Sequence, residues 1–419
     1  MHQFCASLGR AVARFVCFQT WARETLGHCP GFLPNGQVGN CAVSARLNPG
    51  RSRDMSKQSL VIVGGGYIGV ELAQSLSATY AVTLVEPRSA FVHAPAMLRG
   101  LVDPGVREQA LIPYDRVLKD AKLVAARAVG VTSEGARGTG VALEGGETLP
   151  ADVIVLSPGA SNGGIFKPAD EDIDTFRARQ ARVEADIKSA TRIVIVGAGA
   201  VGVELAGEIA HAHPEKAVTL ISSEPKLFPD FPAKLGADLA AKLEAMGVSL
   251  VLGARADNLA STTEPYAGQV SLSNGAVIEA DLVIPAIGSK PQTALFDGLD
   301  GVQKGADGRV KVDGYLRPSR LENVFAAGDA VDTGDAMTIV ATSRQQPWLA
   351  KLLAALAAGK PLESQKPYTP WGKAPILVPL GPRKGASFLM VATFGDWITR
   401  MIKGKDLFIA KYRKLLGYG

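Results

Sequence analysis

One short glycine pattern occurs twice in this chain, and it constrains the fold more than any other feature. Residues 60–72 read LVIVGGGYIGVEL and residues 193–205 read IVIVGAGAVGVEL. In each copy a β-branched run, which predicts a buried strand, ends at the first glycine of Gly-x-Gly-x-x-Gly, and a helical pattern follows at once. The glycines are Gly64, Gly65, Gly66 and Gly69 in the first copy, and Gly197, Gly199 and Gly202 in the second.

This spacing predicts a βαβ dinucleotide-binding unit at each copy. The first glycine permits a tight turn, the second lets backbone approach a pyrophosphate, and the third lets helix pack against strand. The free N–H groups at the helix start favour the pyrophosphate charge. A single copy also suits a plain packing turn, but two copies in the same context favour two nucleotide sites. The predicted fold class is α/β, with two Rossmann-like domains.

The residue that ends the second strand of each unit indicates which nucleotide binds there. In the first unit the strand at 82–85 is followed by Glu86, a carboxylate suited to the adenosine ribose hydroxyls of FAD. In the second unit the strand at 218–221 is followed by Ser222, with Glu224 two residues later. The usual NAD-selecting carboxylate is missing, and so is an arginine for a 2′-phosphate. The sequence therefore leaves NADH and NADPH as alternatives.

A downstream segment assigns FAD to the first unit. Residues 323–330 read NVFAAGDA, a short strand that ends at Gly328 and Asp329. A carboxylate at the start of the next helix would contact the ribityl and phosphate region of a flavin, and a plain helix cap is the alternative. Two other strands end in related turns at Gly159 and Gly288, where we expect the chain to pass between domains.

The order of these motifs predicts the domain organisation. We expect an FAD-binding domain split between residues 55–170 and 291–362, with an NAD(P)H-binding domain at 171–290 inserted into it. From residue 363 the helix and strand alternation stops and prolines accumulate, so residues 363–419 are expected to form a small α+β domain. At 419 residues the chain is long enough for several cores.

The first 54 residues differ from the body. They hold six arginines, no lysine and two acids, and residues 11–16 could form a short amphipathic helix, which fits a mitochondrial presequence. Alternatively, translation starts at Met55, which leads directly into the first strand. Either way we expect residues 1–54 to lie outside the fold and to be poorly ordered. The predicted location is cytoplasmic, or mitochondrial if the presequence is real.

Cysteine content and charge exclude several functions. All four cysteines lie in the first 54 residues, so the body has neither a redox-active cysteine pair nor cysteine ligands for a metal. No apolar run reaches the roughly 20 residues that cross a bilayer. Residues 55–362 are acidic overall, which argues against nucleic-acid binding by this part of the chain. Residues 363–419, in contrast, carry ten bases against three acids.

From about Ser56 to the end, these motifs resemble those of the pyridine-nucleotide flavoprotein oxidoreductases. The segments FVHAPAMLR at 91–99 and RMIKGKDLF at 400–408 are similar to the ferroptosis-suppressor branch of the apoptosis-inducing-factor-like proteins, and type II NADH:quinone dehydrogenases are a more distant resemblance. The resemblance implies that Arg99 binds the phosphate or adenosine half of FAD, that Ala128 contacts adenine through its backbone, and that Asp329 binds the ribityl chain. It also implies a lipophilic, quinone-like acceptor.

The chain departs from that family in two places. The family's Ala-Thr-Gly flavin turn reads Ser157-Pro158-Gly159 here, which keeps the glycine and changes the side chains. The branch commonly carries a myristoylation glycine after Met, but neither Met1 nor Met55 is followed by glycine. That lipid anchor is therefore not expected.

Four residues are candidates for chemistry beside the flavin. Glu204 and Glu208 are four apart on one helix face and could point toward the nicotinamide, with surface acids as the alternative. Lys403 could pair with Glu208 or place positive charge near flavin N1, which would stabilise reduced flavin, or it is a solvated lysine. His93 could donate a proton to an acceptor, or it is satisfied within its loop.

The last 57 residues mix aromatic and basic side chains. Phe388, Phe394, Trp397 and Phe408 could lie on an anionic bilayer and admit a quinone, or they form a core with a rim of lysines. Three functions are compatible with the sequence. The leading one is an FAD-dependent NAD(P)H:quinone oxidoreductase; the others are a reductase of a small redox protein and a redox-signalling flavoprotein with little turnover. Monomer and dimer both stay open.

Overall fold

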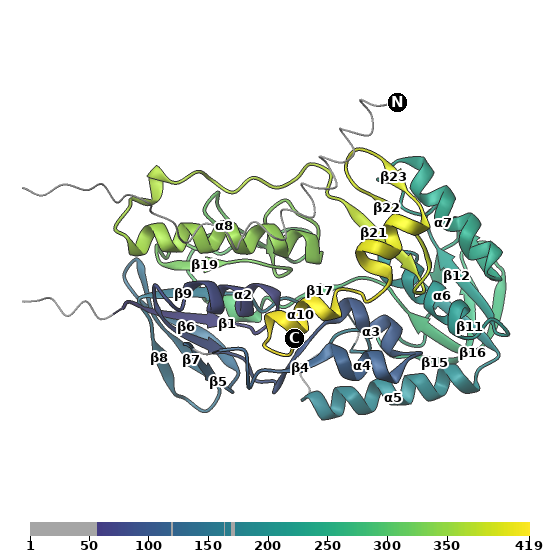
Figure 1. The fold of residues 1–419 in the computed structure, drawn as a ribbon, viewed down its shortest axis with the longest axis horizontal. Coiled ribbons are helices and arrows are strands. Elements are labelled where there is room, and N and C mark those ends of the chain that lie inside the picture. Colours follow the sequence, from purple (N-terminus) through teal and green to yellow (C-terminus); the bar gives the residue numbers. More distant parts are fainter. Residues whose placement is uncertain (1–56, 119, 163, 169–171) are drawn as a thin grey trace, which may run out of the picture. The chain divides into compact units, whose positions relative to one another are not determined.

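A parallel sheet and a mixed, largely parallel sheet carry the two glycine motifs, as the sequence predicts (Figure 1). The computed structural model describes residues 57–118, 120–162, 164–168 and 172–419, so the expected presequence lies outside the described residues. Residues Ser56–Gly419 form one compact unit. The α/β class with two Rossmann-like units is confirmed, whereas the boundaries at 170, 290 and 362 stay predictions.

The first sheet has five parallel strands in the order β19-β9-β1-β2-β5. Since side chains alternate along a strand, Leu60 and Ile62 of β1 pack with helices α2 and α8, whereas Val61 and Val63 pack with the antiparallel strands β6–β8. The elements are β19 (Val324–Ala326), β9 (Val153–Leu156), β1 (Ser59–Val63), β2 (Ala81–Val85), β5 (Lys122–Val124), α2 (Tyr67–Leu76), α8 (Ile339–Ala357), β6 (Ala128–Glu134), β7 (Arg137–Leu143) and β8 (Thr148–Pro150).

The second sheet has six strands in the order β13-β12-β11-β16-β15-β14, with the first four parallel. Ile193 and Ile195 of β11 pack with the helical layer, and Val194 and Val196 pack with the β14–β16 side. The elements are β13 (Val248–Leu252), β12 (Ala217–Ser222), β11 (Arg192–Val196), β16 (Val277–Pro285), β15 (Tyr266–Leu272), β14 (Ala256–Asp257), α5 (Ile173–Ser189), α6 (Ala200–Ala212) and α7 (Ala233–Ala245).

The chain crosses between the two sheets at a pair of short strands. Strand β10 (Ala160–Ser161) follows Gly159 and pairs antiparallel with β17 (Lys290–Pro291), which follows Gly288. Both glycines have a positive φ, 75° and 68°, in the left-handed region that favours glycine. The remaining elements of the body are β3 (Ala90–Val92), α3 (Ala94–Gly100), α4 (Pro104–Ala110), β4 (Leu111–Pro113), η2 (Ala294–Phe296), β18 (Val310–Lys311), β20 (Val331–Asp332) and η3 (Leu362–Ser364).

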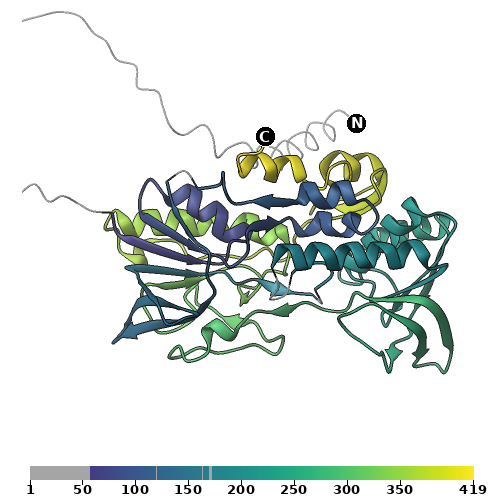
Figure 2. The same ribbon diagram turned by 90° about the horizontal axis from the view of Figure 1, so that it is seen from below.

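The C-terminal segment packs against both sheet units (Figures 1 and 2). Val378, Leu380 and Phe388 belong to the core around α6, whereas Tyr412 and Leu416 belong to the core around α2. The segment contains a three-stranded antiparallel sheet and helices, which agrees with the α+β prediction. Its elements are β21 (Ile376–Leu380), β22 (Lys384–Phe388), β23 (Thr393–Phe394), α9 (Asp396–Thr399), the π-helix η4 (Arg400–Gly404) and α10 (Ile409–Leu415).

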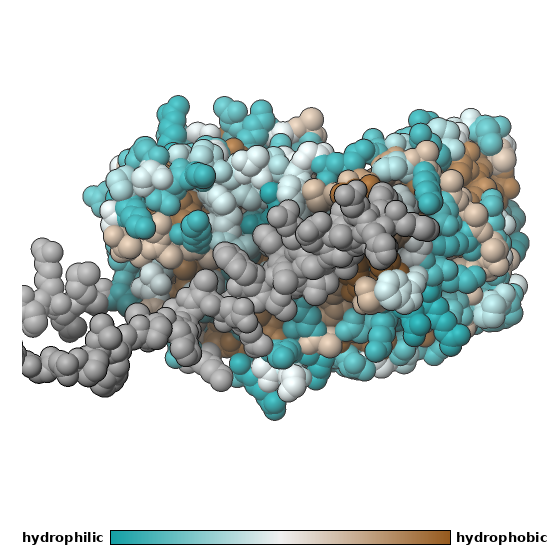
Figure 3. All heavy atoms as spheres, turned by 45° about the horizontal axis from the view of Figure 1, so that its top comes forward, coloured by the Kyte–Doolittle hydropathy of each residue, from teal (hydrophilic) through white to brown (hydrophobic). Residues whose placement is uncertain are grey.

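On the face that Figure 3 shows, hydrophilic side chains alternate with separate areas of hydrophobic ones. None of the helices in the described ranges combines the length and hydropathy that a membrane crossing requires.

The close contact between helix and glycine loop can be tested by adding one methyl group. A Cβ at position 69 would overlap the carbonyl oxygen of Gly64. We therefore expect Gly69→Ala to lower the free energy of unfolding by about 2 kcal/mol, even though alanine favours helix. Gly66→Ala is the matched control, because no atom lies within 4 Å of its added Cβ. Urea unfolding without added FAD measures both, and equal stabilities would contradict this packing.

Candidate active site

The first glycine loop is closed on its sheet side and open on its helix side. Gly64 follows β1 with a φ of 99°, and a Cβ there would overlap the carbonyl oxygen of Ser157. Gly69 lies against Gly64 itself. Gly66 is the N-cap of α2 and has open space where its side chain would be. A dinucleotide pyrophosphate fits this arrangement, because it can approach the backbone at the helix N-terminus.

The carboxylate of Glu86 lies at this loop, at the end of β2. Its Oε2 accepts a hydrogen bond from the N–H of Gly65 at 2.7 Å, and its Oε1 accepts one from Nε of Arg88 at 2.7 Å. The Glu86 side chain is buried. The sequence placed an acid at this strand end correctly, and its contact with the FAD ribose stays a prediction.

Asp329 lies beside a lysine that the sequence gave no reason to select. The residue follows Gly328, whose φ is 90°, and its carboxylate accepts a hydrogen bond from Nζ of Lys167 at 3.0 Å. The N–H of Gly328 donates to Oε1 of Gln345, on α8, at 2.8 Å. Lys167 and Gln345 therefore join the candidate flavin site. Neither belongs to a recognisable motif, so only the fold reveals them.

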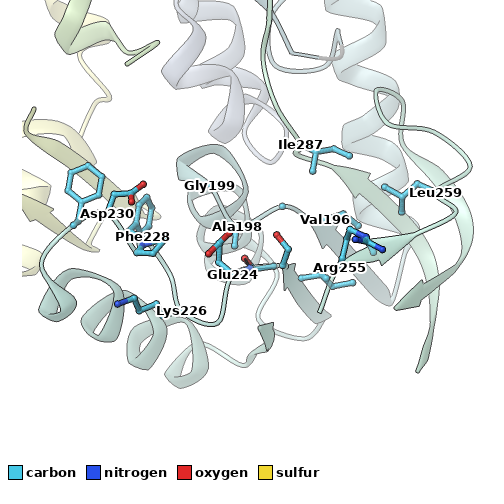
Figure 4. Close-up of a pocket in the computed structure, with 17 residues that line it drawn as sticks. Val196, Ala198, Gly199, Glu224, Lys226, Phe228, Asp230, Arg255, Leu259 and Ile287 are labelled. Atoms are coloured by element: carbon cyan, nitrogen blue, oxygen red, sulfur yellow. Dashed lines mark hydrogen bonds between the residues drawn. The ribbon is translucent and has the colours of Figure 1, made fainter. Parts of the chain in front are cut away.

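A cavity of about 600 Å³ opens at the second glycine loop (Figure 4). Gly197 has a φ of 107°, and a Cβ there would lie 2.6 Å from the carbonyl oxygen of Ala286. A Cβ at Gly202 would overlap Gly197, whereas Gly199 has open space. This geometry repeats that of the first loop. The volume of the cavity is in the range of small-molecule sites and suits a nucleotide.

The charged side chains of this cavity are mixed in sign. Figure 4 shows Glu224 beside Ala198 and Gly199 and Arg255 beside Val196. Ser222 is buried, and its Oγ accepts a hydrogen bond from the N–H of Glu224 at 3.1 Å. The Nε of Arg255 donates to Asp257 at 2.7 Å, and this pairing raises the pKa of Arg255. Neither positive nor negative charge dominates in this cavity, so NADH and NADPH both remain possible.

The two predicted helix acids are buried and each has its own cation. The expected pairing of Lys403 with Glu208 is wrong: Nζ of Lys403 donates to Oε1 of Glu204 at 2.6 Å. Glu208 instead accepts two hydrogen bonds from Arg99, at 2.9 and 2.8 Å. Burial raises the pKa of Glu204, although Lys403 opposes that shift. These two ion pairs join α6 to η4 and to α3.

Arg99 and Ala128, which the family resemblance assigns to FAD binding, both have partners within the protein. Arg99 is buried on α3, and its guanidinium donates two hydrogen bonds to the carboxylate of Glu208. Ala128 begins β6 and pairs with Leu143. Contacts of either residue with FAD stay predictions.

His93 is completely buried and both of its ring nitrogens have partners. Its Nε2 lies 2.5 Å from the carbonyl oxygen of Leu407, so it must donate there, and Nδ1 accepts from the hydroxyl of Tyr67 at 3.0 Å. Burial lowers the pKa of His93 to about 4. The imidazole is therefore neutral near pH 7, and the geometry favours the alternative of a satisfied structural histidine over a proton donor.

Comparison with known proteins gives concordant results. A family model described as pyridine nucleotide-disulphide oxidoreductase matches residues 21–111 and 114–347. Apoptosis-inducing factor homolog B of Dictyostelium discoideum is 30% identical over 383 residues, which cover 85% of this chain and 96% of the relative. Ferroptosis suppressor protein 1 of Homo sapiens is 28% identical over 372 residues, with coverages of 84% and 94%.

A solved structure of the covalent putidaredoxin reductase–putidaredoxin complex contains a similar chain. Its TM-score is 0.61 at 18% identity, over 79% of this chain and 81% of that chain. At this identity the likeness concerns the fold alone.

The buried state of His93 predicts a pH dependence of stability. The pKa is about 4 when folded and ordinarily about 6.5 when unfolded. Between these values only the unfolded chain binds the proton, so His93 should cost up to about 3 kcal/mol of stability as pH falls from 6.5 to 4. His93→Gln keeps a donor for Leu407 but does not titrate. Unfolding free energies across this range should show a smaller decline in the variant, and parallel curves would refute the assignment.

Restoring a carboxylate at the end of β12 should separate the two nicotinamide nucleotides. In Ser222→Glu the new charge would repel a 2′-phosphate, so the Kd for NADP⁺ should rise at least about tenfold relative to that for NAD⁺. Ser249→Glu, on the neighbouring strand β13, is the matched control outside the cavity. Calorimetric titration measures both constants. An unchanged Kd ratio with NAD⁺ binding retained would show that Ser222 does not face the ribose.

Proposed function

Since this chain belongs to the pyridine nucleotide-disulphide oxidoreductase family, we propose that it transfers electrons from NAD(P)H through FAD to a quinone-type acceptor. The chain is an NAD(P)H-dependent flavoprotein oxidoreductase. The acceptor is the proposed part, and the absence of cysteine from residues 55–419 limits it to an acceptor that takes electrons from the flavin itself. A relay through a redox disulfide needs a thiolate beside the flavin, so electrons must leave the flavin directly.

The glycine loops supply the two binding sites. FAD would be held by the first loop, with Glu86 at the adenosine ribose and Asp329 near the ribityl chain. Nicotinamide nucleotide would be held by the second loop and its cavity, with Ser222 facing the ribose. When bound, the flavin supplies the chemistry of hydride acceptance and electron release.

The buried charges around α6 would position the groups that meet at the flavin. Lys403 and Glu204 bring a cation and a carboxylate together in a site with little water, where their interaction is strong. Lys167 adds a second cation beside Asp329. We propose that these cations favour reduced, anionic flavin, and that Glu208 acts through Arg99 by fixing α3 against α6.

Two acceptors are candidates for this chain. The similarity extends over 96% of apoptosis-inducing factor homolog B and 94% of ferroptosis suppressor protein 1. This favours an acceptor shared with that branch. A reductase of a small redox protein is the second candidate, because the basic segment at 363–419 would attract an acidic partner.

An anaerobic two-step experiment tests the proposed acceptor. The FAD-loaded protein is first reduced with NADH or NADPH, then mixed with a short-chain quinone, a ferredoxin or air in a stopped-flow instrument. We expect the quinone to reoxidise the flavin at least about tenfold faster than ferredoxin or air does. The reason is that the proposed acceptor is a small apolar molecule, which reaches the flavin without a protein–protein interface. A long-lived reduced complex with negligible quinone turnover would overturn the proposal, and faster reaction with ferredoxin would favour the second candidate.

A further inference from the structure

The turn between η4 and α10 holds two adjacent residues in an unfavourable backbone conformation. Leu407 has a φ of 53° and Phe408 a φ of 66°, in the left-handed region that residues with a Cβ rarely adopt. They are the only neighbouring pair of this kind among the described non-glycine residues. Such a backbone persists only where the surrounding structure holds it, and it is common at functional sites.

Leu407 is tied to the protein through both of its backbone polar groups. Its N–H donates to the carbonyl oxygen of Lys403, on η4, at 2.7 Å. Its carbonyl oxygen lies 2.5 Å from Nε2 of His93, which donates to it. His93 is the N-cap residue of α3, 314 positions away in the sequence. The turn is therefore held by its own helix on one side and by a distant side chain on the other.

The same turn determines where the Lys403 side chain can reach. Nζ of Lys403 donates to Oε1 of Glu204 at 2.6 Å and to the carbonyl oxygen of Leu377 at 3.1 Å. Lys403 lies on a π-helix, a wide turn that is frequent at functional sites. Because the Lys403 backbone is bonded to Leu407, a shift of this turn would move the ammonium group of Lys403 relative to Glu204.

His93 is itself fixed in one position and one tautomer. It is completely buried, and its ring centroid lies 4.8 Å from that of Tyr412 and 6.0 Å from that of Tyr67. The Tyr67 hydroxyl donates to Nδ1 at 3.0 Å, so the single proton of the neutral ring stays on Nε2, where the Leu407 carbonyl requires it. Tyr67 is the first residue of α2 and directly follows the first glycine loop.

We propose that His93 is a positioning residue for Lys403: its Nε2–H group holds the carbonyl oxygen of Leu407, and the turn held in this way keeps the Lys403 ammonium beside Glu204. This inference rests on the proposed function, in which Lys403 favours reduced flavin. The hydrogen bonds couple the helix after the first glycine loop to the helix after the second. The effect of His93 on the flavin passes through Lys403, which distinguishes it from a histidine that only satisfies a buried carbonyl.

The reduction potential of the flavin measures whether His93 acts on Lys403. In His93→Phe the aromatic ring stays and the donor is lost, so the turn can relax and the cation can move away. We expect the equilibrium between the FAD-loaded protein and a reference dye to shift at least about tenfold toward oxidised flavin, which is about 30 mV for a two-electron couple. His93→Gln keeps a donor for Leu407, so its equilibrium should stay within about twofold of that of the unchanged protein.

Tyr80→Phe is the matched control for a purely structural effect. The buried Tyr80 hydroxyl donates to the carbonyl oxygen of Leu353 at 2.7 Å, so this variant also takes a buried donor away from a backbone carbonyl. We expect Tyr80→Phe to unfold at a lower urea concentration than the unchanged protein and to leave the dye equilibrium as it was. An equal shift in Tyr80→Phe and His93→Phe would mean general loosening and would overturn the proposal.

A double-mutant cycle with Lys403→Met identifies the route of the effect. Lys403→Met should itself shift the dye equilibrium toward oxidised flavin, and adding His93→Phe to it should change the equilibrium less than about twofold further. The proposal fails if His93→Phe has the same effect with and without Lys403. It also fails if Lys403→Met shifts the equilibrium and His93→Phe does not.

Urea unfolding of the FAD-loaded proteins separates this inference from the proposed function. An unchanged potential in Lys403→Met would contradict the proposed role of this cation at the flavin, and the unfolding data then decide the inference. The combined effect of His93→Phe and Lys403→Met on the unfolding equilibrium constant should be at least about threefold smaller than the product of their separate effects. Multiplicative effects would show that the two residues act independently.

The tautomer of His93 can be read in the unchanged protein, whether or not His93→Phe folds. The chain contains five histidines, so ¹⁵N-histidine labelling gives a simple spectrum, in which the signal missing from His93→Gln identifies His93. We expect a neutral ring whose proton is on Nε2 and exchanges slowly with water. A proton on Nδ1 would leave no donor for Leu407 and would overturn the proposal.

Discussion

The structure depends on one steric constraint, the contact between a helix glycine and the carbonyl oxygen of the glycine that ends a strand. Gly69 over Gly64 and Gly202 over Gly197 leave no room for even a methyl group. This contact fixes where each helix begins relative to its sheet, and so directs its free N–H groups at one point beyond the strand ends. The neighbouring positions Gly66 and Gly199 stay open, which is where a pyrophosphate can approach.

The C-terminal segment joins these two units. Its strands belong to the core around α6, and its last helix belongs to the core around α2. Between them Lys403 binds Glu204, and Arg99 binds Glu208 nearby. Burying ion pairs adds little net stability because desolvation opposes the attraction, whereas removing one partner leaves an uncompensated charge. Such pairs favour one arrangement of α3, α6 and η4. A fixed arrangement is needed because the nicotinamide ring and the flavin ring must meet for hydride transfer.

The sequence predicted the parts of the site that local patterns determine. Strand, glycine turn and helix follow each other directly, so both loops and the acids at Glu86 and Asp329 were found from spacing. The partner of Lys403 was predicted incorrectly, since spacing puts Glu204 and Glu208 on one face but does not say which acid meets η4. Lys167 and Gln345 reach the site from elements distant in sequence, and no local signal indicates them.

The central claim is a direct relay from nicotinamide to flavin to acceptor, with no disulfide between them. The number of electrons taken up per flavin tests it most directly. In an anaerobic dithionite titration of the FAD-loaded protein, followed by flavin absorbance, a flavin alone accepts two electrons. We predict complete bleaching at two electrons per flavin. A requirement for four would reveal a second redox centre in contact with the flavin and would contradict the account.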